Sequence, residues 1–85
     1  MPYIPILARV KIDEAANKLR LEIKSLGDLN YAITQLILGQ IPAHVRYQDY
    51  VALLGTLEAV KLELYRKAVA PYEDKKSDEN GEVYF

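Results

Sequence analysis

The chain has 85 residues, of which 51% are hydrophobic and 27% charged, and its formal net charge is −1. This size and composition predict one small globular domain over residues 1–85, with a core that is marginal for a single copy, and they exclude an intrinsically disordered protein. The absence of cysteine excludes disulfides and cysteine-ligated metal sites. The absence of a long apolar run or a signal peptide predicts a cytoplasmic protein without a membrane partner. The near-neutral charge disfavours sequence-specific nucleic-acid binding.

The first predicted helix follows an extended start. Pro2 and Pro5 bias their neighbours away from helix, so residues 1–7 are expected to be extended. Apolar residues then recur at steps of three and four, which predicts a helix with one apolar stripe. Gly27 is expected to cap its carboxyl end in the left-handed conformation. The stripe consists of Ile12, Ala16, Leu19, Ile23 and Leu26.

A second helix is expected directly afterwards, with Asp28 as its N-cap. Leu29, Ala32, Ile33, Leu36 and Ile37 give it an apolar stripe. It should end near Gly39–Ile41, because Pro42 cannot continue it. Tyr31 and Leu38 project on the opposite side. A helix with apolar residues on two sides is either buried or shared between subunits, and the short chain favours sharing.

The third predicted helix is the longest and runs from about Tyr47 to Ala70. Its inner face is formed by Tyr50, Leu54, Leu57, Leu64, Tyr65 and Ala68. Gly55 interrupts the helix, and a glycine at such a position predicts close packing of another backbone.

The last segment, residues 71–85, is predicted to be ordered although it is mostly polar. Pro71 should stop or kink the long helix, and the acidic first turn followed by Gly81 predicts a second, short helix and a turn. A hairpin at Asn80-Gly81 is the alternative. Tyr72, Tyr84 and Phe85 would supply the packing surface that so short a helix needs.

Together these elements predict an all-α protein. The expected architecture is a small three-helix bundle or helical hairpin with a long third helix, a C-terminal tail packed back on it, and a homo-oligomeric assembly.

Lys61 is the most informative side chain because it falls between Leu57 and Leu64 on the apolar stripe of the third helix. A lysine in that position must pair, extend to solvent or meet an anion. The alternatives are an ion pair with Glu58 at a helix or subunit contact, a cation that binds an anionic ligand, and a catalytic lysine. No nucleophile arrangement accompanies it.

A candidate ligand site gathers cations and tyrosines around this lysine. Arg66 lies close to Tyr65 near the end of the long helix, and such pairs can hold a phosphate and stack a base. Complementing the helix dipole and ordinary packing are the alternatives. The predicted ligand-binding residues are Tyr31, Glu58, Lys61, Tyr65, Arg66, Tyr72 and Tyr84. No catalytic residue, metal site or cofactor is predicted, since His44 stands alone and no acidic quartet is evident.

Two stretches, "GDLNYAITQLI" and "GTLEAVKLELYRKAVAPYEDKKSDENGEVY", resemble a family of small uncharacterised proteins of tailed bacteriophages and bacteria. The matching motifs lie at Gly27–Thr34, Glu63–Lys67 and Pro71–Tyr84. Lys67 and Glu82 stand where the family usually has Arg and Asp. The resemblance implies a phage context and a tail that belongs to the fold.

The resulting functional hypothesis is a non-enzymatic, homo-oligomeric phage-type protein that sequesters a small anionic ligand, such as a nucleotide signal, in host counter-defence. It would act in the host cytoplasm if phage-encoded. An inhibitor or adaptor that binds a host protein is one alternative, and an all-α hydrolase of the nucleotide pyrophosphatase kind is the other.

Overall fold

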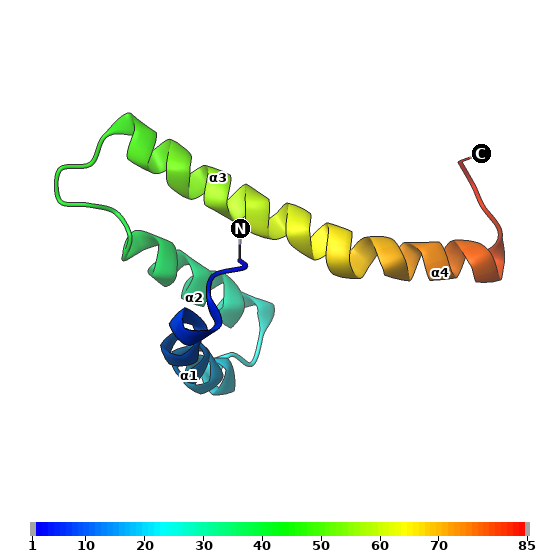
Figure 1. The fold of residues 1–85 in the computed structure, drawn as a ribbon, viewed down its shortest axis with the longest axis horizontal. Coiled ribbons are helices and arrows are strands. Elements are labelled where there is room, and N and C mark those ends of the chain that lie inside the picture. Colours follow the sequence, from blue (N-terminus) through cyan, green and yellow to red (C-terminus); the bar gives the residue numbers. More distant parts are fainter. Residues whose placement is uncertain (1, 85) are drawn as a thin grey trace. The chain divides into compact units, whose positions relative to one another are not determined.

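The computed structural model describes residues 2–84, and all their regular secondary structure is helical (Figure 1). The prediction of an all-α protein is therefore confirmed, and the hairpin alternative is wrong because the described residues form no strand. The helices are α1 (Ile6–Glu22), α2 (Leu26–Leu38), α3 (Tyr47–Leu64), the π-helix η1 (Tyr65–Val69) and α4 (Ala70–Asn80).

The chain divides into two compact units, residues 1–53 and residues 54–85. The first contains α1, α2 and the beginning of α3, and the second contains the rest of α3, η1, α4 and the tail. Within the first unit, α1 and α2 share few close contacts. The three-helix bundle therefore stays a prediction.

The start of α1 depends on Pro5. Residues 2–5 are not helical, and Pro5 is the N-cap, whose carbonyl accepts a hydrogen bond of 3.0 Å from the backbone N–H of Ala8. Proline suits this position because its fixed φ is compatible with a helix and its missing donor is not needed there. The extended start thus ends two residues before the predicted residue 7.

The junction between α1 and α2 differs from the sequence prediction. Glu22 ends α1, with extended backbone at Ile23, and Ser25 is the N-cap of α2. The Ser25 hydroxyl accepts a hydrogen bond of 3.0 Å from the backbone N–H of Asp28, and Asp28 Oδ2 accepts one of 2.9 Å from the backbone N–H of Lys24. This reciprocal pair satisfies donors that a helix start leaves free. Gly27 and Asp28 therefore lie inside the first turn of α2 and cap neither helix in the predicted way.

The long helix changes its winding before the proline. The α-helical winding of α3 ends at Leu64. At the end of η1, the backbone N–H of Ala70, the first residue of α4, donates a hydrogen bond to the carbonyl of Tyr65, five residues earlier. Pro71 lacks a donor and its ring crowds the preceding turn, and a π-turn is a known way to absorb such a disturbance. The predicted helix Tyr47–Ala70 is thus present, but its last turn is π-helical and it passes directly into α4.

Gly81 ends α4 as predicted. Its φ of 94° is the one positive φ among the described residues, and its N–H donates to the carbonyl of Ser77 at 2.8 Å. Glycine adopts this backbone region without the steric cost that a side chain would add. The turn that follows leads into the short tail at residues 82–84.

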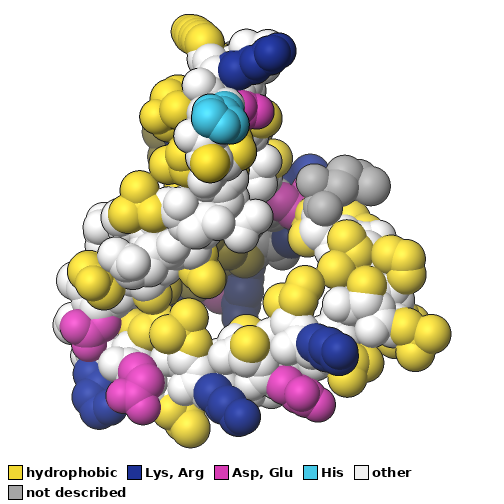
Figure 2. Space-filling model, turned by 90° about the vertical axis from the view of Figure 1, so that its left-hand side faces the viewer, with side chains coloured by type: hydrophobic (Ala, Val, Ile, Leu, Met, Phe, Trp, Pro, Cys, Tyr) yellow, Lys and Arg dark blue, Asp and Glu magenta, His cyan; other side chains and the backbone are white. Residues whose placement is uncertain are grey.

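No residue between 2 and 84 is buried. Figure 2 shows hydrophobic side chains spread over the face in view, with charged groups between them. Large side chains of α2 and α3 are well exposed, for example Leu36 at 58% and Leu54 at 65%. Gly55 also lies open, since a Cβ added there would meet no atom within 4 Å. The close backbone packing predicted at Gly55 is therefore not found among residues 2–84.

Candidate functional site

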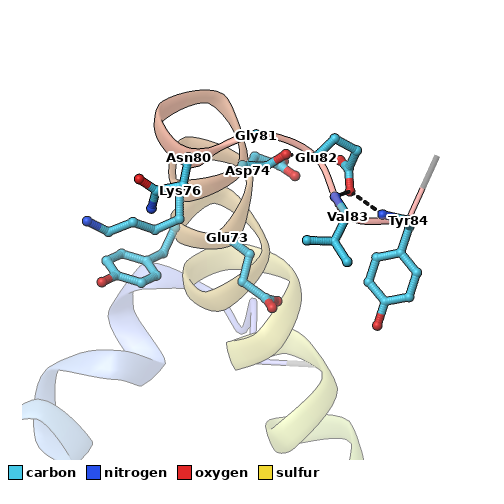
Figure 3. A pocket seen from close by; sticks show the side chains of 10 residues that line it. Glu73, Asp74, Lys76, Asn80, Gly81, Glu82, Val83 and Tyr84 are labelled. Atoms are coloured by element: carbon cyan, nitrogen blue, oxygen red, sulfur yellow. Dashed lines mark hydrogen bonds between the residues drawn. The ribbon is translucent and has the colours of Figure 1, made fainter.

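An open hollow of about 420 Å³ lies beside α4 and the tail that follows it (Figure 3). Its walls come from α4 and from the residues after Gly81. Three carboxylates and one lysine contribute to it, so the lining is acidic. The lining residues are Tyr72, Glu73, Asp74, Lys76, Ser77, Asn80, Gly81, Glu82, Val83 and Tyr84.

Glu82 fixes the tail of this hollow. Its Oε1 accepts hydrogen bonds from the backbone N–H groups of Val83 at 2.8 Å and Tyr84 at 2.9 Å, drawn as dashed lines in Figure 3. Its Oε2 accepts a hydrogen bond of 2.9 Å from the hydroxyl of Ser77 on α4. The backbone donor of Tyr84, then the Ser77 hydroxyl and the donor of Val83, lower the pKa of Glu82 because they stabilise the carboxylate.

A second contact connects η1 with α4. The Tyr65 hydroxyl donates a hydrogen bond of 2.5 Å to Oε1 of Glu73. This bond and the charge of Glu73 raise the pKa of Tyr65, because both favour the neutral phenol. One turn further along, Lys76 Nζ lies 5.7 Å from the ring centre of Tyr72, within the range of a cation–π contact. Tyr65 and Tyr72 thus take part in contacts within the stretch from η1 to α4.

The two cations of the predicted site are each paired with a glutamate three residues earlier in the chain. Lys61 Nζ lies 3.4 Å from Oε1 of Glu58, and Arg66 donates a hydrogen bond of 2.8 Å to Oε1 of Glu63. The side chains of Lys61 and Arg66 are 73% and 66% exposed. Exposed pairs of this spacing are weak and exchange readily with water or another partner.

Tyr31 belongs to a different place in the fold. It lines a hollow of about 380 Å³ between α1 and α2, in the first unit. The walls of this hollow are mostly apolar, and its two ionisable carboxylates are Glu22 and Asp28. The remaining lining residues are Leu19, Ile23, Ala32, Gln35 and Leu36.

The structure therefore distributes the predicted ligand residues over several local groups of contacts. Tyr72 and Tyr84 share the tail hollow, Glu58 pairs with Lys61 on α3, and Tyr31 lines the hollow of the first unit. Tyr65 bonds Glu73, which also lines the tail hollow, and Arg66 pairs with Glu63.

The sequence reasoning missed Glu82 and Ser77. The available signal was an acidic residue directly after the glycine that ends a helix, where its carboxylate can reach free backbone donors.

In residues 2–84, no three or more His, Asp or Glu side chains are grouped in a way that could hold a metal ion. None of the helices formed by these residues has both the length and the apolar character needed to cross a membrane.

These observations define a class: an all-helical protein with short-range polar contacts and with apolar side chains facing outward. A family model described as a domain of unknown function (DUF6899) matches residues 1–83, and the chain belongs to this family. The expected membership in an uncharacterised family is thereby confirmed. Comparisons with curated proteins and with solved structures gave no significant match.

Proposed function

We propose that this chain is a non-enzymatic binding protein that works as an assembly of several copies. The supporting observation is that none of residues 2–84 is buried although half of the chain is hydrophobic. Full burial of one exposed Leu, Ile or Val side chain contributes about 1.5–3 kcal/mol. The apolar side chains of α2 and α3 can gain this contribution when neighbouring copies cover them.

The second unit, residues 54–85, also exposes large apolar side chains. It is one helical stretch followed by a short tail, and Val60, Leu62 and Leu64 on it are each about 60% exposed (62%, 58% and 62%). A helix with apolar residues on every side is characteristic of a buried position. Such a helix needs a covering surface, and other copies of the same chain provide one at the same concentration as the chain itself.

Sedimentation equilibrium and thermal unfolding, each over a wide range of protein concentrations, test this proposal. We expect a defined oligomer whose melting temperature rises with protein concentration, because association stabilises the folded state by mass action. A chain that remains monomeric at high concentration and melts cooperatively at a temperature independent of dilution would refute it.

Sequestration of an anionic ligand stays a prediction, and the charges around the two hollows do not support it. Carboxylates outnumber cations in both linings, and Lys61 and Arg66 are already paired with glutamates. Thermal shift measurements with cyclic and linear nucleotides test the idea, and recovery of intact nucleotide separates binding from hydrolysis. Host counter-defence is the setting that the resemblance to phage proteins implies, and a pulldown from host lysate tests the adaptor alternative.

A further inference from the structure

The part of α3 in the second unit carries a coiled-coil spacing. Leu54, Leu57, Lys61 and Leu64 follow one another at steps of three, four and three residues, which is the spacing of the inward positions of a heptad repeat. These four residues are called the α3 seam below. They lie on a continuous α-helix, and Leu54 and Leu64 at its ends are 65% and 62% exposed.

Lys61 occupies an inward position of this seam. A single lysine or asparagine at such a position is a recognised way to select register and orientation at some cost in stability. The side chain of Lys61 is 73% exposed, and its one described ion pair is the 3.4 Å contact with Glu58 on the same helix. It is therefore available to a second helix that would pack on the seam.

The charges distinguish the two possible orientations of that second helix. In a parallel pair in register, Lys61 of each copy faces Lys61 of the other, and the two like charges repel. In an antiparallel pair centred between residues 57 and 61, Lys61 lies opposite Leu57 of the other copy, next to its Glu58. The symmetry of the pair gives this contact twice, and Leu54 then faces Leu64.

We infer that the α3 seam is the site where two copies of the chain associate in antiparallel orientation, with Lys61 of each copy bound by Glu58 of the other. This inference rests on the proposed function and names the surface and partner that it requires. On association, the helix-internal Glu58–Lys61 pair of each of the two copies is replaced by a pair between chains, so that two internal pairs give way to two symmetric ones. The occupant of the seam is a second copy, selected by charge complementarity.

Two oppositely charged variants test the inference. Glu58→Lys carries two lysines on the seam edge, and Lys61→Glu carries two glutamates there. Each alone places like charges together at both symmetric contacts, so we expect its self-association to weaken by about tenfold or more. Mixed in equal amounts, the two variants regain complementary charges, and association should return to near the wild-type value. Repair of the helix-internal pair cannot explain this return, because that pair has like charges in both variants.

Arg66→Glu is the matched control. Arg66 pairs with Glu63 at the same i,i+3 spacing as the Lys61–Glu58 pair, but it lies outside the seam, so this variant should self-associate as the wild type does. Circular dichroism of each variant verifies that it remains helical. Orientation is measured with cysteines, which the native chain lacks: Leu54→Cys mixed with Leu64→Cys should cross-link, whereas Leu54→Cys alone should cross-link only in a parallel pair.

The outcomes separate the two proposals. If the wild type assembles but Glu58→Lys and Lys61→Glu assemble equally well, or if Leu54→Cys cross-links with itself, the seam inference is wrong and the proposed function stands. Failure of the mixture to restore association also overturns the seam inference. A wild-type chain that is monomeric overturns the proposed function, and the inference with it.

Discussion

Replacing Ser25 by alanine tests how the chain turns from α1 into α2. The Ser25 hydroxyl accepts the 3.0 Å hydrogen bond from the backbone N–H of Asp28, and alanine leaves that donor without its partner. Loss of a serine N-cap typically costs about 1 kcal/mol, within a range of roughly 0.5–2 kcal/mol. For a domain of this size, about 1 kcal/mol corresponds to a fall in melting temperature of about 4–8 °C.

The assay is thermal unfolding followed by circular dichroism at a fixed protein concentration. Ser25→Asn is the control, because asparagine retains an acceptor at the cap and should melt within a few tenths of a kcal/mol of the wild type. If Asp28 were the N-cap, as the sequence predicted, Ser25→Ala would leave the melting temperature unchanged. That result would refute the junction described above.

Three further changes test other local features. Gly55→Ala should stabilise the chain by about 0.5–1 kcal/mol in chemical denaturation, since its Cβ meets nothing within 4 Å; a loss of stability would place another backbone there. The contribution of Glu82 is present above the ordinary carboxyl range and is lost as pH falls through its lowered pKa, so Glu82→Gln should abolish an acid-dependent shift of the Tyr84 amide in NMR spectra. The hydrogen bond from Tyr65 to Glu73 is present below pH 10.0, the ordinary pKa of tyrosine, and is lost as pH rises through the raised value; Tyr65→Phe should remove one late step from the alkaline absorbance titration, and an unchanged titration would contradict the contact.

The main helices could be predicted because their signals are repeated along the chain. Apolar residues at three- and four-residue steps indicated helices at α1, α2 and α3, and several residues would have to change before that pattern disappeared. The end of α4 was predictable for a different reason. Gly81 is one residue, but its positive φ is a backbone state that few other residues adopt readily.

The junctions could not be predicted because they depend on which of several similar hydrogen bonds forms. Gly27 and Asp28 are good capping residues, but so is Ser25, and its bond with the N–H of Asp28 places the helix start three residues earlier than the predicted cap. The π-turn before Pro71 could not be predicted either, because several local backbone arrangements can accommodate a proline. Pro71 signals a disturbance, but the sequence does not indicate whether a kink, a stop or a wider turn absorbs it.

The predicted site was limited by its reliance on residue type. Lysine, arginine and tyrosine were grouped as ligand residues because such side chains bind phosphates and bases. The structure gives Lys61, Arg66 and Tyr65 each an acidic neighbour on its own stretch of helix. The Lys61–Glu58 pair was one of the alternatives predicted from the sequence, and the same spacing of three residues could have indicated the Arg66–Glu63 pair. The contact from Tyr65 to Glu73 spans eight residues across the π-turn and has no comparable signal.

The tail and the α3 seam differ in what they need from a partner. The tail is held by contacts within the same chain, since Glu82 bonds two backbone donors beyond Gly81 and the hydroxyl of Ser77 on α4. It is therefore ordered before any partner binds, and a surface ordered in advance loses less conformational entropy on association. Tyr84 on the tail and Tyr72 on α4 are 83% and 61% exposed. The seam on α3 has no such local support for its leucines, so we expect assembly to be driven by α3 and the tail to add a preformed aromatic contact.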